Sequence, residues 1–344
     1  MKATKWIGVD IHKKQITICI INDNGVKDQL VFERTPEGIE KFIPHINNNT
    51  IIGVESTTWT RDFAIKCVPF AQDVIIFNTI ELKKLMDRTK KTDKIDSAKI
   101  ALILQRFEKD ELSICTIKSD EFAEVKGLLN IREKLVRRKT ETKNEIIAML
   151  DYWGESRKEK FFLKLEADKQ WIADKVKIPA TIRTAVLGLI ETIEIYEKQI
   201  KDIGNDIEGK LKDNAGYCAV TENIKGVGKT TGAYIISKIE DVNRFENHKK
   251  LVSYFGLAPK VSMSDGKGFN GHISKNTDKG LLRVLIQAAW ISVKYDKTMK
   301  AFYDNLRARS CKQKAIVAVA RKIIVNAFYI LKQVETCKKT GIYT

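Results

Sequence analysis

One carboxylate inside a strongly apolar stretch restricts what this sequence can fold into more than any other feature. Residues 6–12 and 16–21 are rich in β-branched apolar side chains, and three charged or polar residues, 13–15, separate them. This pattern predicts two strands joined by a hairpin turn. Asp10 lies inside the first strand. Because a buried carboxylate is costly unless a cation compensates it, we expect further ligands and a metal ion to converge on Asp10.

Three other carboxylates are candidates for the same site. Glu55 ends a second apolar run, and Asp93 and Asp96 lie three residues apart at the start of a helical pattern. That spacing puts both aspartates on one helix face. Mg²⁺ prefers hard oxygen ligands and keeps several waters, so three or four carboxylates suffice for it, and Mn²⁺ can substitute. Two such ions about 3.5–4 Å apart can assist attack on a phosphodiester.

Each of these three carboxylates also has an ordinary structural explanation. Asp93 could be a helix N-cap, and Asp96 could pair with Lys99 on a solvated face. Glu55 could cap the segment after its strand. The combination of all four with a basic chain favours metal binding.

The charge of the chain favours a polyanionic partner. The 344 residues carry 61 Lys and Arg against 44 Asp and Glu, a formal net charge of +17, with the basic residues spread along the whole length. Nucleic acid is the partner that we expect, and a ribosomal-type or merely soluble basic protein is the alternative.

Cysteine usage and hydropathy indicate a reducing compartment. The six cysteines are scattered without a CxxC pair, no apolar run approaches a membrane span, and the first residues lead into a strand without a secretory segment. We therefore expect a cytoplasmic protein without disulfides, zinc site or membrane contact.

The pattern changes twice along the chain, which predicts α/β followed by all-α structure in three domains. Residues 1–118 show antiparallel strands and then strand–helix alternation, an order that resembles the ribonuclease H-like fold of the RuvC type. Residues 119–215 have apolar spacings of three, four and seven, which predict either a coiled coil, antiparallel or intermolecular, or a helical linker packed on its own chain. Residues 216–344 are predicted to be mainly helical, with a polar loop at 262–271.

Residues 221–233 have the form of a helix-hairpin-helix motif. Gly226 and Gly228 allow a tight turn, and the following helix would offer free N–H groups to a phosphate. Lys225 and Lys229 add positive charge at the same place. A plain corner between two helices explains this pattern equally well.

The motifs at both ends of the chain resemble one family, the DEDD transposases of insertion sequences (the "IS one-ten" group, with the Piv and MooV recombinases). The resemblance rests on residues 8–10, 54–55, 91–97, 224–228, 255–259, 273–275 and 281–283. These segments follow one another in the family's order, with a variable helical middle between them.

The resemblance implies a site-specific DNA recombinase whose RuvC-like domain holds a metal tetrad and whose second domain supplies a nucleophilic serine. Carried over by position, the tetrad is Asp10, Glu55, Asp93 and Asp96. The serine falls on Ser264, with Ser262 and Ser274 as nearby competitors. The resemblance also implies target and donor DNA, a bridge RNA that pairs with both, and a homo-oligomer, dimer to tetramer, associated with a bacterial or archaeal nucleoid.

Three points stay open in the sequence. A serine hydroxyl needs a base or a metal for activation, and neither histidine nor cysteine neighbours Ser264, so activation would come from the metal cluster across a domain or subunit interface. Ser274, Lys275 and Arg283 could hold nucleic acid, although a solvated basic face explains them as well. A RuvC-like metal nuclease or junction resolvase with water as nucleophile, and a catalytically silent scaffold, are the competing functions.

Overall fold

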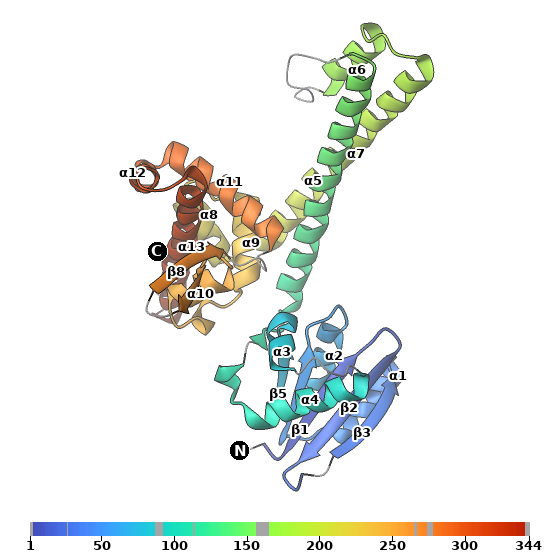
Figure 1. Cartoon of the computed structure of the whole chain (residues 1–344), viewed down its shortest axis with the longest axis vertical. Helices are drawn as coiled ribbons and strands as arrows, with labels where there is room; N and C mark the ends of the chain where they lie inside the picture. The colour runs from blue at the N-terminus through green and yellow to red at the C-terminus, as the bar shows by residue number, and fades with distance from the viewer. Residues whose placement is uncertain are drawn as a thin grey trace. The chain divides into compact units, whose positions relative to one another are not determined.

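The computed structural model describes residues 3–25, 27–86, 92–112, 114–155, 165–264, 267–273 and 278–340. The chain forms two compact units, Met1–Lys118 and Ser119–Thr344 (Figure 1). The division into three domains stays a prediction.

The first unit is built on a mixed sheet, as the strand patterns predict, and this sheet has six strands. The strands are β1 (Lys5–Ile11), β2 (Gln15–Asn22), β3 (Lys27–Glu33), β4 (Thr50–Glu55), β5 (Asp73–Phe77) and β6 (Ile114–Cys115). Their order in the sheet is β3-β2-β1-β4-β5-β6. The first three strands are antiparallel, β4 and β5 run parallel to β1, and β6 is antiparallel to β5. This arrangement is consistent with a RuvC-like domain.

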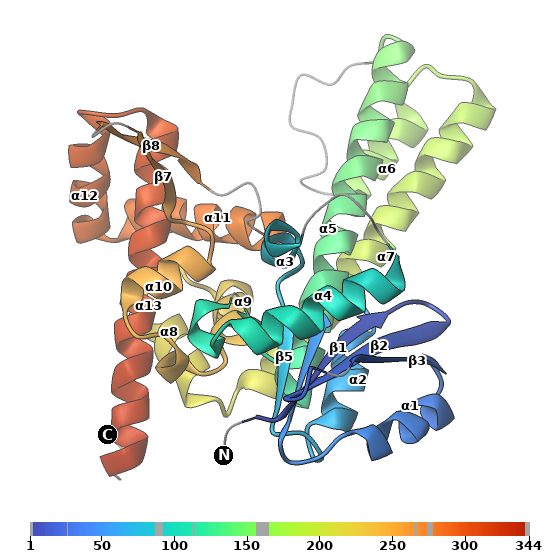
Figure 2. The ribbon, with the colours of Figure 1, turned by 60° about the horizontal axis from the view of Figure 1, so that its bottom comes forward.

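Helices cover both faces of this sheet. They are α1 (Pro36–Phe42), α2 (Thr60–Cys67), α3 (Thr79–Leu85) and α4 (Asp93–Arg106), with short 3-10 helices at Ile43–His45 and Lys109–Glu111. Phe42 of α1 and Phe63 of α2 pack with alternate residues of the central strands in one core cluster, whereas Ala101 of α4 packs with Cys19 and Ile21 on the opposite face. Figure 2 shows the sheet between α4 and the pair α1 and α2. Period-two alternation in the strands produces these two cores.

Glycine in β1 lets α4 approach the sheet closely. A Cβ atom on Gly8 would overlap the carbonyl oxygen of Ser97 and would lie 3.1 Å from the Cα atom of Ala101. Since these are backbone atoms, they cannot move aside as a flexible side chain would. The helix therefore lies directly on the strand that carries Asp10.

The second unit begins with a helical hairpin. Its helices are α5 (Asp120–Tyr152), α6 (Leu165–Asp174) and α7 (Ala180–Leu211). The start of α5 packs with the end of α7 around Phe122 and Leu211, and the end of α5 packs with the start of α7 around Leu150 and Val186. The two long helices are therefore antiparallel and pair within one chain, which is one of the arrangements that the apolar spacing left open. Coiled-coil packing of these helices stays a prediction.

The rest of the second unit is helical apart from one hairpin. Its elements are α8 (Ala215–Asn223), α9 (Lys229–Ile239), a 3-10 helix (Val242–Arg244), α10 (His248–Tyr254), β7 (Pro259–Ser264), β8 (Lys267–Ile273), α11 (Lys279–Tyr295), α12 (Lys297–Arg307) and α13 (Lys312–Thr340). The apolar side of α13 lies in the largest core cluster of this unit, together with α8 to α11. Over the parts of the chain that the structure describes, no helix has both the length and the apolar character needed to cross a membrane.

The prediction of a polar loop at 262–271 was wrong. The structure has two antiparallel strands there, β7 and β8, in which Ser262 pairs with Phe269 and Ser264 pairs with Lys267. The prediction relied on glycine and serine content. Apolar Val261 and Met263 alternate with polar neighbours, and that period of two is the pattern of a strand.

Candidate metal centre and nucleic-acid surface

Two of the predicted carboxylates lie side by side at one edge of the sheet. Val9 of β1 pairs with Val54 of the parallel strand β4, so Asp10 and Glu55 are the next residues of adjacent strands. Both strands run toward this edge. Gly8 and Gly53, which lie two residues before Asp10 and Glu55 in their strands, face α4. Because side chains two residues apart project from the same face, Asp10 and Glu55 share the face that α4 covers.

The first turn of α4 brings the other two carboxylates to this face. Thr92 is the N-cap, and its hydroxyl oxygen accepts a hydrogen bond of 3.3 Å from the N–H of Ile95. Asp93 is therefore the first helical residue, and the alternative that it serves as the N-cap is wrong. Asp93 and Asp96 both lie in the first turn, where the helix dipole favours negative charge.

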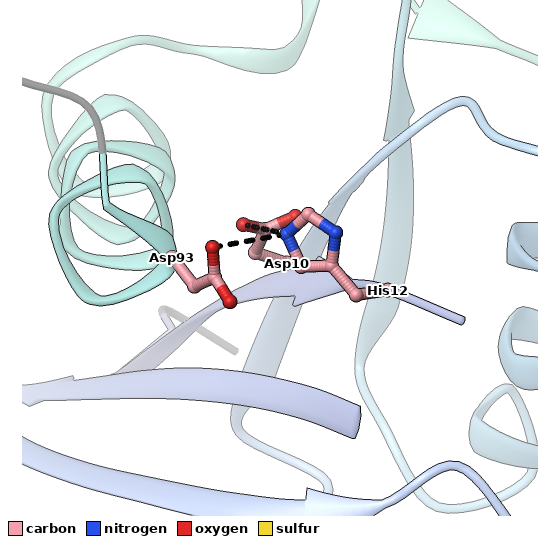
Figure 3. Close-up of side chains that lie close together, drawn as sticks. All are labelled: Asp10, His12 and Asp93. Carbon is pink, nitrogen blue, oxygen red and sulfur yellow. Dashed lines mark hydrogen bonds and ion pairs between the residues drawn. The ribbon is translucent and has the colours of Figure 1, made fainter. Parts of the chain in front are cut away.

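Asp10 and Asp93 converge on one histidine that the sequence analysis did not propose. His12 Nε2 lies 3.1 Å from Asp10 Oδ2 and 3.1 Å from Asp93 Oδ1 (Figure 3). One ligand atom from each of these three residues lies within 4.8 Å of the other two. His12 comes two residues after Asp10 at the end of β1, so period-two alternation was the sequence signal that pointed to it.

Gln15 is a second residue that the sequence analysis did not assign to the site. Its side-chain amide donates a hydrogen bond of 3.0 Å to Asp93 Oδ2. The backbone N–H of His12 donates to the Gln15 carbonyl across the hairpin turn, at 2.9 Å. The β1–β2 turn therefore positions both residues, and Gln15 holds the second oxygen of Asp93.

The electrostatics of this cluster fit a cation. Burial raises the pKa of the Asp10 carboxyl, and the negative charges of Asp93 and Asp96 raise it further. His12 lowers this pKa, but the net pKa is still raised. Burial alone would lower the pKa of His12, but the carboxylates of Asp10 and Asp93 outweigh it and raise the net value. Crowded, partly desolvated carboxylates are stabilised by a positive charge placed among them. The residues present therefore suit a divalent metal.

Glu55 and Asp96 lie near this cluster but outside its tightest group. Among the described residues, the group with ligand atoms within 4.8 Å consists of Asp10, His12 and Asp93. Asp96 is close enough to act on the charge of Asp10. Glu55 Oε1 lies 4.0 Å from Lys83 Nζ in an ion pair, and this side chain is 27% exposed. The tetrad of four carboxylates therefore stays a prediction.

The candidate serines belong to the second unit. Ser264 is the last residue of β7, and in residues 259–264 and 267–273 the structure describes only the backbone. Ser274 and Lys275 lie outside the described residues. A nucleophilic role for Ser264 stays a prediction.

The predicted helix-hairpin-helix is a turn between α8 and α9. Gly226 has φ +96°, and a Cβ atom there would meet the Ala288 carbonyl oxygen at 2.5 Å and the Ser292 nitrogen at 2.7 Å. The Ser292 hydroxyl also donates a hydrogen bond to the Lys225 carbonyl. Gly226 therefore allows the turn to pack against α11, while Gly228 is the N-cap of α9 and lies in open space.

Of the basic residues proposed for nucleic acid, Lys225, Lys229 and Arg283 are described and exposed, and two of them pair with acids. Lys225 and Lys229 are exposed, and Lys229 forms an ion pair with Glu208. Arg283 lies 3.7 Å from Glu133. Binding of nucleic acid by these residues, and by the glycines of the turn, stays a prediction.

A basic hollow lies beside this turn. It measures about 460 Å³ and is formed by α5, α7 and the start of α9. Its charged lining residues are Arg132, Lys139, Glu197, Lys201, Glu208 and Lys229. Four cationic side chains against two carboxylates leave an excess of positive charge, which suits a phosphate backbone.

Two family models match the chain. One, described as a transposase and named for the DEDD motif and IS110, matches residues 7–153. The other, described as "Transposase IS116/IS110/IS902 family", matches residues 218–304. The first match contains Asp10, Glu55, Asp93 and Asp96, and the second contains Ser264.

Known proteins of similar sequence agree with these matches. A transposase for insertion sequence element IS1111A of Coxiella burnetii is 25% identical over 354 residues, which covers 98% of this chain and 92% of that protein. A pilin gene-inverting protein of Moraxella bovis is 24% identical, and the match covers 95% of this chain and 96% of that protein. A probable family 20 transposase of Pseudomonas aeruginosa is 22% identical, with 73% and 75% of the two chains covered.

Proposed function

The chain belongs to the IS110-type family of DEDD transposases, and we propose that it cuts and rejoins DNA through a covalent link between Ser264 and a DNA strand. The observation that carries this proposal is the convergence of Asp10 and Asp93 at the edge of the sheet. These carboxylates come from distant parts of the sequence and are held there at the cost of mutual repulsion, which a cation would relieve.

We propose that the cation is Mg²⁺, with Mn²⁺ as a substitute. The residues that would hold it are Asp10, Glu55, Asp93 and Asp96. A bound cation of this kind stabilises the negative charge that develops on the phosphate and on the leaving oxygen. Gln15 would keep Asp93 oriented, and the first turn of α4 would support its charge.

In the proposed reaction the Ser264 oxygen attacks a backbone phosphorus atom. The bond from phosphorus to the 3′ oxygen breaks and leaves a 5′-phosphoserine. The serine proton passes through a base at the site to the leaving 3′ oxygen, which becomes a free 3′ hydroxyl. A 3′ hydroxyl from another strand then attacks the phosphoserine and regenerates the serine. No cofactor is consumed, because one phosphodiester is exchanged for an equivalent bond. The similarity to a protein named for gene inversion supports this reaction, since inversion of a segment requires that its ends be rejoined.

We propose that the partners are target and donor DNA, a bridge RNA from the element, and further copies of this chain up to a tetramer. The net charge of +17 and the basic hollow beside α9 support binding of several nucleic-acid segments. Base pairing by the RNA would supply the sequence specificity, while the protein grips the backbone. Ser264 and the carboxylates belong to different units, so the proposal requires that a serine reach a metal centre in its own chain or in another copy.

A metal-dependent nuclease or junction resolvase is the second candidate. One observation favours it: Asp10, His12, Gln15 and Asp93 all belong to the first unit, so this centre could direct attack by water without a serine.

Protein–DNA adducts distinguish the two functions. The protein is incubated with Mg²⁺, the RNA that copurifies with it and labelled DNA from the element's junctions, and the products are separated on a denaturing gel. The proposed function predicts an adduct that Ser264→Ala abolishes and the matched variant Ser262→Ala retains. Nicked DNA without an adduct in the wild-type protein would indicate the nuclease. Asp10→Asn should abolish cleavage in either case.

A further inference from the structure

The cluster at the edge of the sheet contains a nitrogen donor besides its carboxylates. The family is named for its acidic residues, whereas in this chain the ring of His12 faces Asp10 and Asp93 with a single nitrogen atom, Nε2 (Figure 3). We infer that His12 contributes Nε2 as a ligand to the divalent cation held by Asp10 and Asp93. This inference rests on the proposed metal-dependent function.

The distances within the cluster suit a shared coordination sphere. In octahedral coordination with bonds of about 2.1 Å, neighbouring ligand atoms lie about 3 Å apart. Nε2 lies 3.1 Å from an oxygen of Asp10 and 3.1 Å from an oxygen of Asp93. Three donor atoms this close together could bind one cation. The proton of the neutral ring would then reside on Nδ1, the nitrogen that Figure 3 shows pointing away from the carboxylates.

The backbone holds His12 in this position independently of any metal. His12 follows the last residue of β1, and its N–H donates to the carbonyl of Gln15 across the turn at 2.9 Å. Gln15 in turn donates to the other oxygen of Asp93. Because the same turn positions the imidazole and one of the carboxylates, the donor set needs little ordering when a cation binds.

A nitrogen ligand changes which metals the site prefers. Mg²⁺ takes hard oxygen ligands, whereas imidazole suits later divalent ions, whose affinity for nitrogen rises from Mn²⁺ toward Cu²⁺. The site should therefore bind Mn²⁺ more tightly, relative to Mg²⁺, than a site with carboxylates alone. His12 would be a determinant of metal specificity for the proposed recombinase.

Electron spin-echo envelope modulation of bound Mn²⁺ tests this inference directly, because it detects a nitrogen nucleus bonded to the ion. We expect nitrogen modulation in the full-length protein, its change on labelling with ¹⁵N-histidine, and its loss in His12→Gln. His45→Gln is the matched control, since His45 lies in the same unit with its ring against Phe32, and it should keep the signal. The labelled wild-type protein gives a result even if a variant folds poorly.

Metal affinities provide a second readout. His12→Gln should lower the affinity for Mn²⁺ about tenfold and the affinity for Mg²⁺ about threefold or less, measured by titration calorimetry. Bound Mn²⁺ without nitrogen modulation in the wild-type protein, or with modulation that persists in His12→Gln, would overturn this inference and leave the proposed function intact. If the wild-type protein bound no Mn²⁺, or if Asp10→Asn bound it as tightly as the wild type, this inference and the proposed function would both be wrong.

Discussion

Gly8 of β1 lies directly beneath Ser97 of α4, so close that a Cβ atom on Gly8 would overlap the Ser97 carbonyl oxygen. Asp10 projects from the same face of the strand, two residues further along, and Asp93 lies one turn before Ser97 in the helix. The approach of helix to strand at Gly8 therefore sets the separation of the two carboxylates that converge on His12.

Replacing Gly8 by alanine should displace α4 and with it the metal centre. The added methyl group would meet backbone atoms of Ser97 and Ala101, which cannot yield, so we expect a loss of about 3 kcal/mol in the free energy of unfolding. Urea denaturation measures this loss, and titration with Mn²⁺ should show weaker binding in the fraction that remains folded. Gly127→Ala is the control, because Gly127 lies in α5 with open space around it and should gain about 1 kcal/mol. Equal stability of Gly8→Ala and the wild type would contradict the packing argument.

Removing Lys83 should strengthen metal binding. Lys83 Nζ lies 4.0 Å from Glu55 Oε1, so this ammonium group competes with a cation for the carboxylate. We expect Lys83→Met to raise the affinity for Mg²⁺ about two- to fivefold, which is the effect of one exposed ion pair. The neighbouring Lys84 pairs with Glu81, so Lys84→Met should leave the affinity unchanged. If Lys83→Met showed no increase in affinity, a role of Glu55 as a ligand would be contradicted.

Lys201 in the basic hollow should contribute to nucleic-acid binding through phosphate contacts. Neutralised phosphates release counterions, so the logarithm of the affinity should fall linearly with the logarithm of the salt concentration. Lys201→Ala should reduce the steepness of that line by about one and weaken binding about fivefold at about 0.1 M salt. Lys338→Ala, on α13 beside Glu335, serves as the control and should change neither quantity. A flat salt response of the wild-type protein would exclude electrostatic binding.

Cys67 should resist alkylation for as long as the first unit stays folded. Burial raises the pKa of this thiol from its ordinary value to about 12, so almost no reactive thiolate is present at pH 8. Iodoacetamide should modify the exposed Cys311 and Cys337, and mass spectrometry should find Cys67 modified only in urea.

The raised pKa of Cys67 also has a consequence for stability. Since the folded state favours the neutral thiol, the contribution of Cys67 to stability is fully present below pH 9 and is lost as the pH rises toward 12. The free energy of unfolding of Cys67→Ala should therefore depend less on pH between these values than that of the wild-type protein. A steeper dependence of stability on pH in the variant would contradict a raised pKa of Cys67.

Local patterns in the sequence were sufficient for many of the elements and for part of the site. The period-two strands around Asp10 and Glu55 predicted the mixed sheet, and the i, i+3 spacing placed Asp93 and Asp96 on one turn of a helix. Such patterns depend on residues within a few positions of one another, so a single sequence contains them completely. Where composition was used in place of the pattern, at 262–271, the prediction failed.

The tertiary structure alone determined which side chains meet. Gln15 contacts Asp93 across 78 residues of sequence, and His12 joins Asp10 to Asp93 because the close packing of α4 on Gly8 brings the helix to that end of β1. The ion pair of Glu55 with Lys83 is likewise a contact between separate elements. No local period specifies contacts of this kind, since they depend on the relative positions of elements that the sequence keeps far apart. The sequence thus determined that carboxylates stand at the ends of particular strands and helices, and packing determined that an imidazole and an amide stand among them.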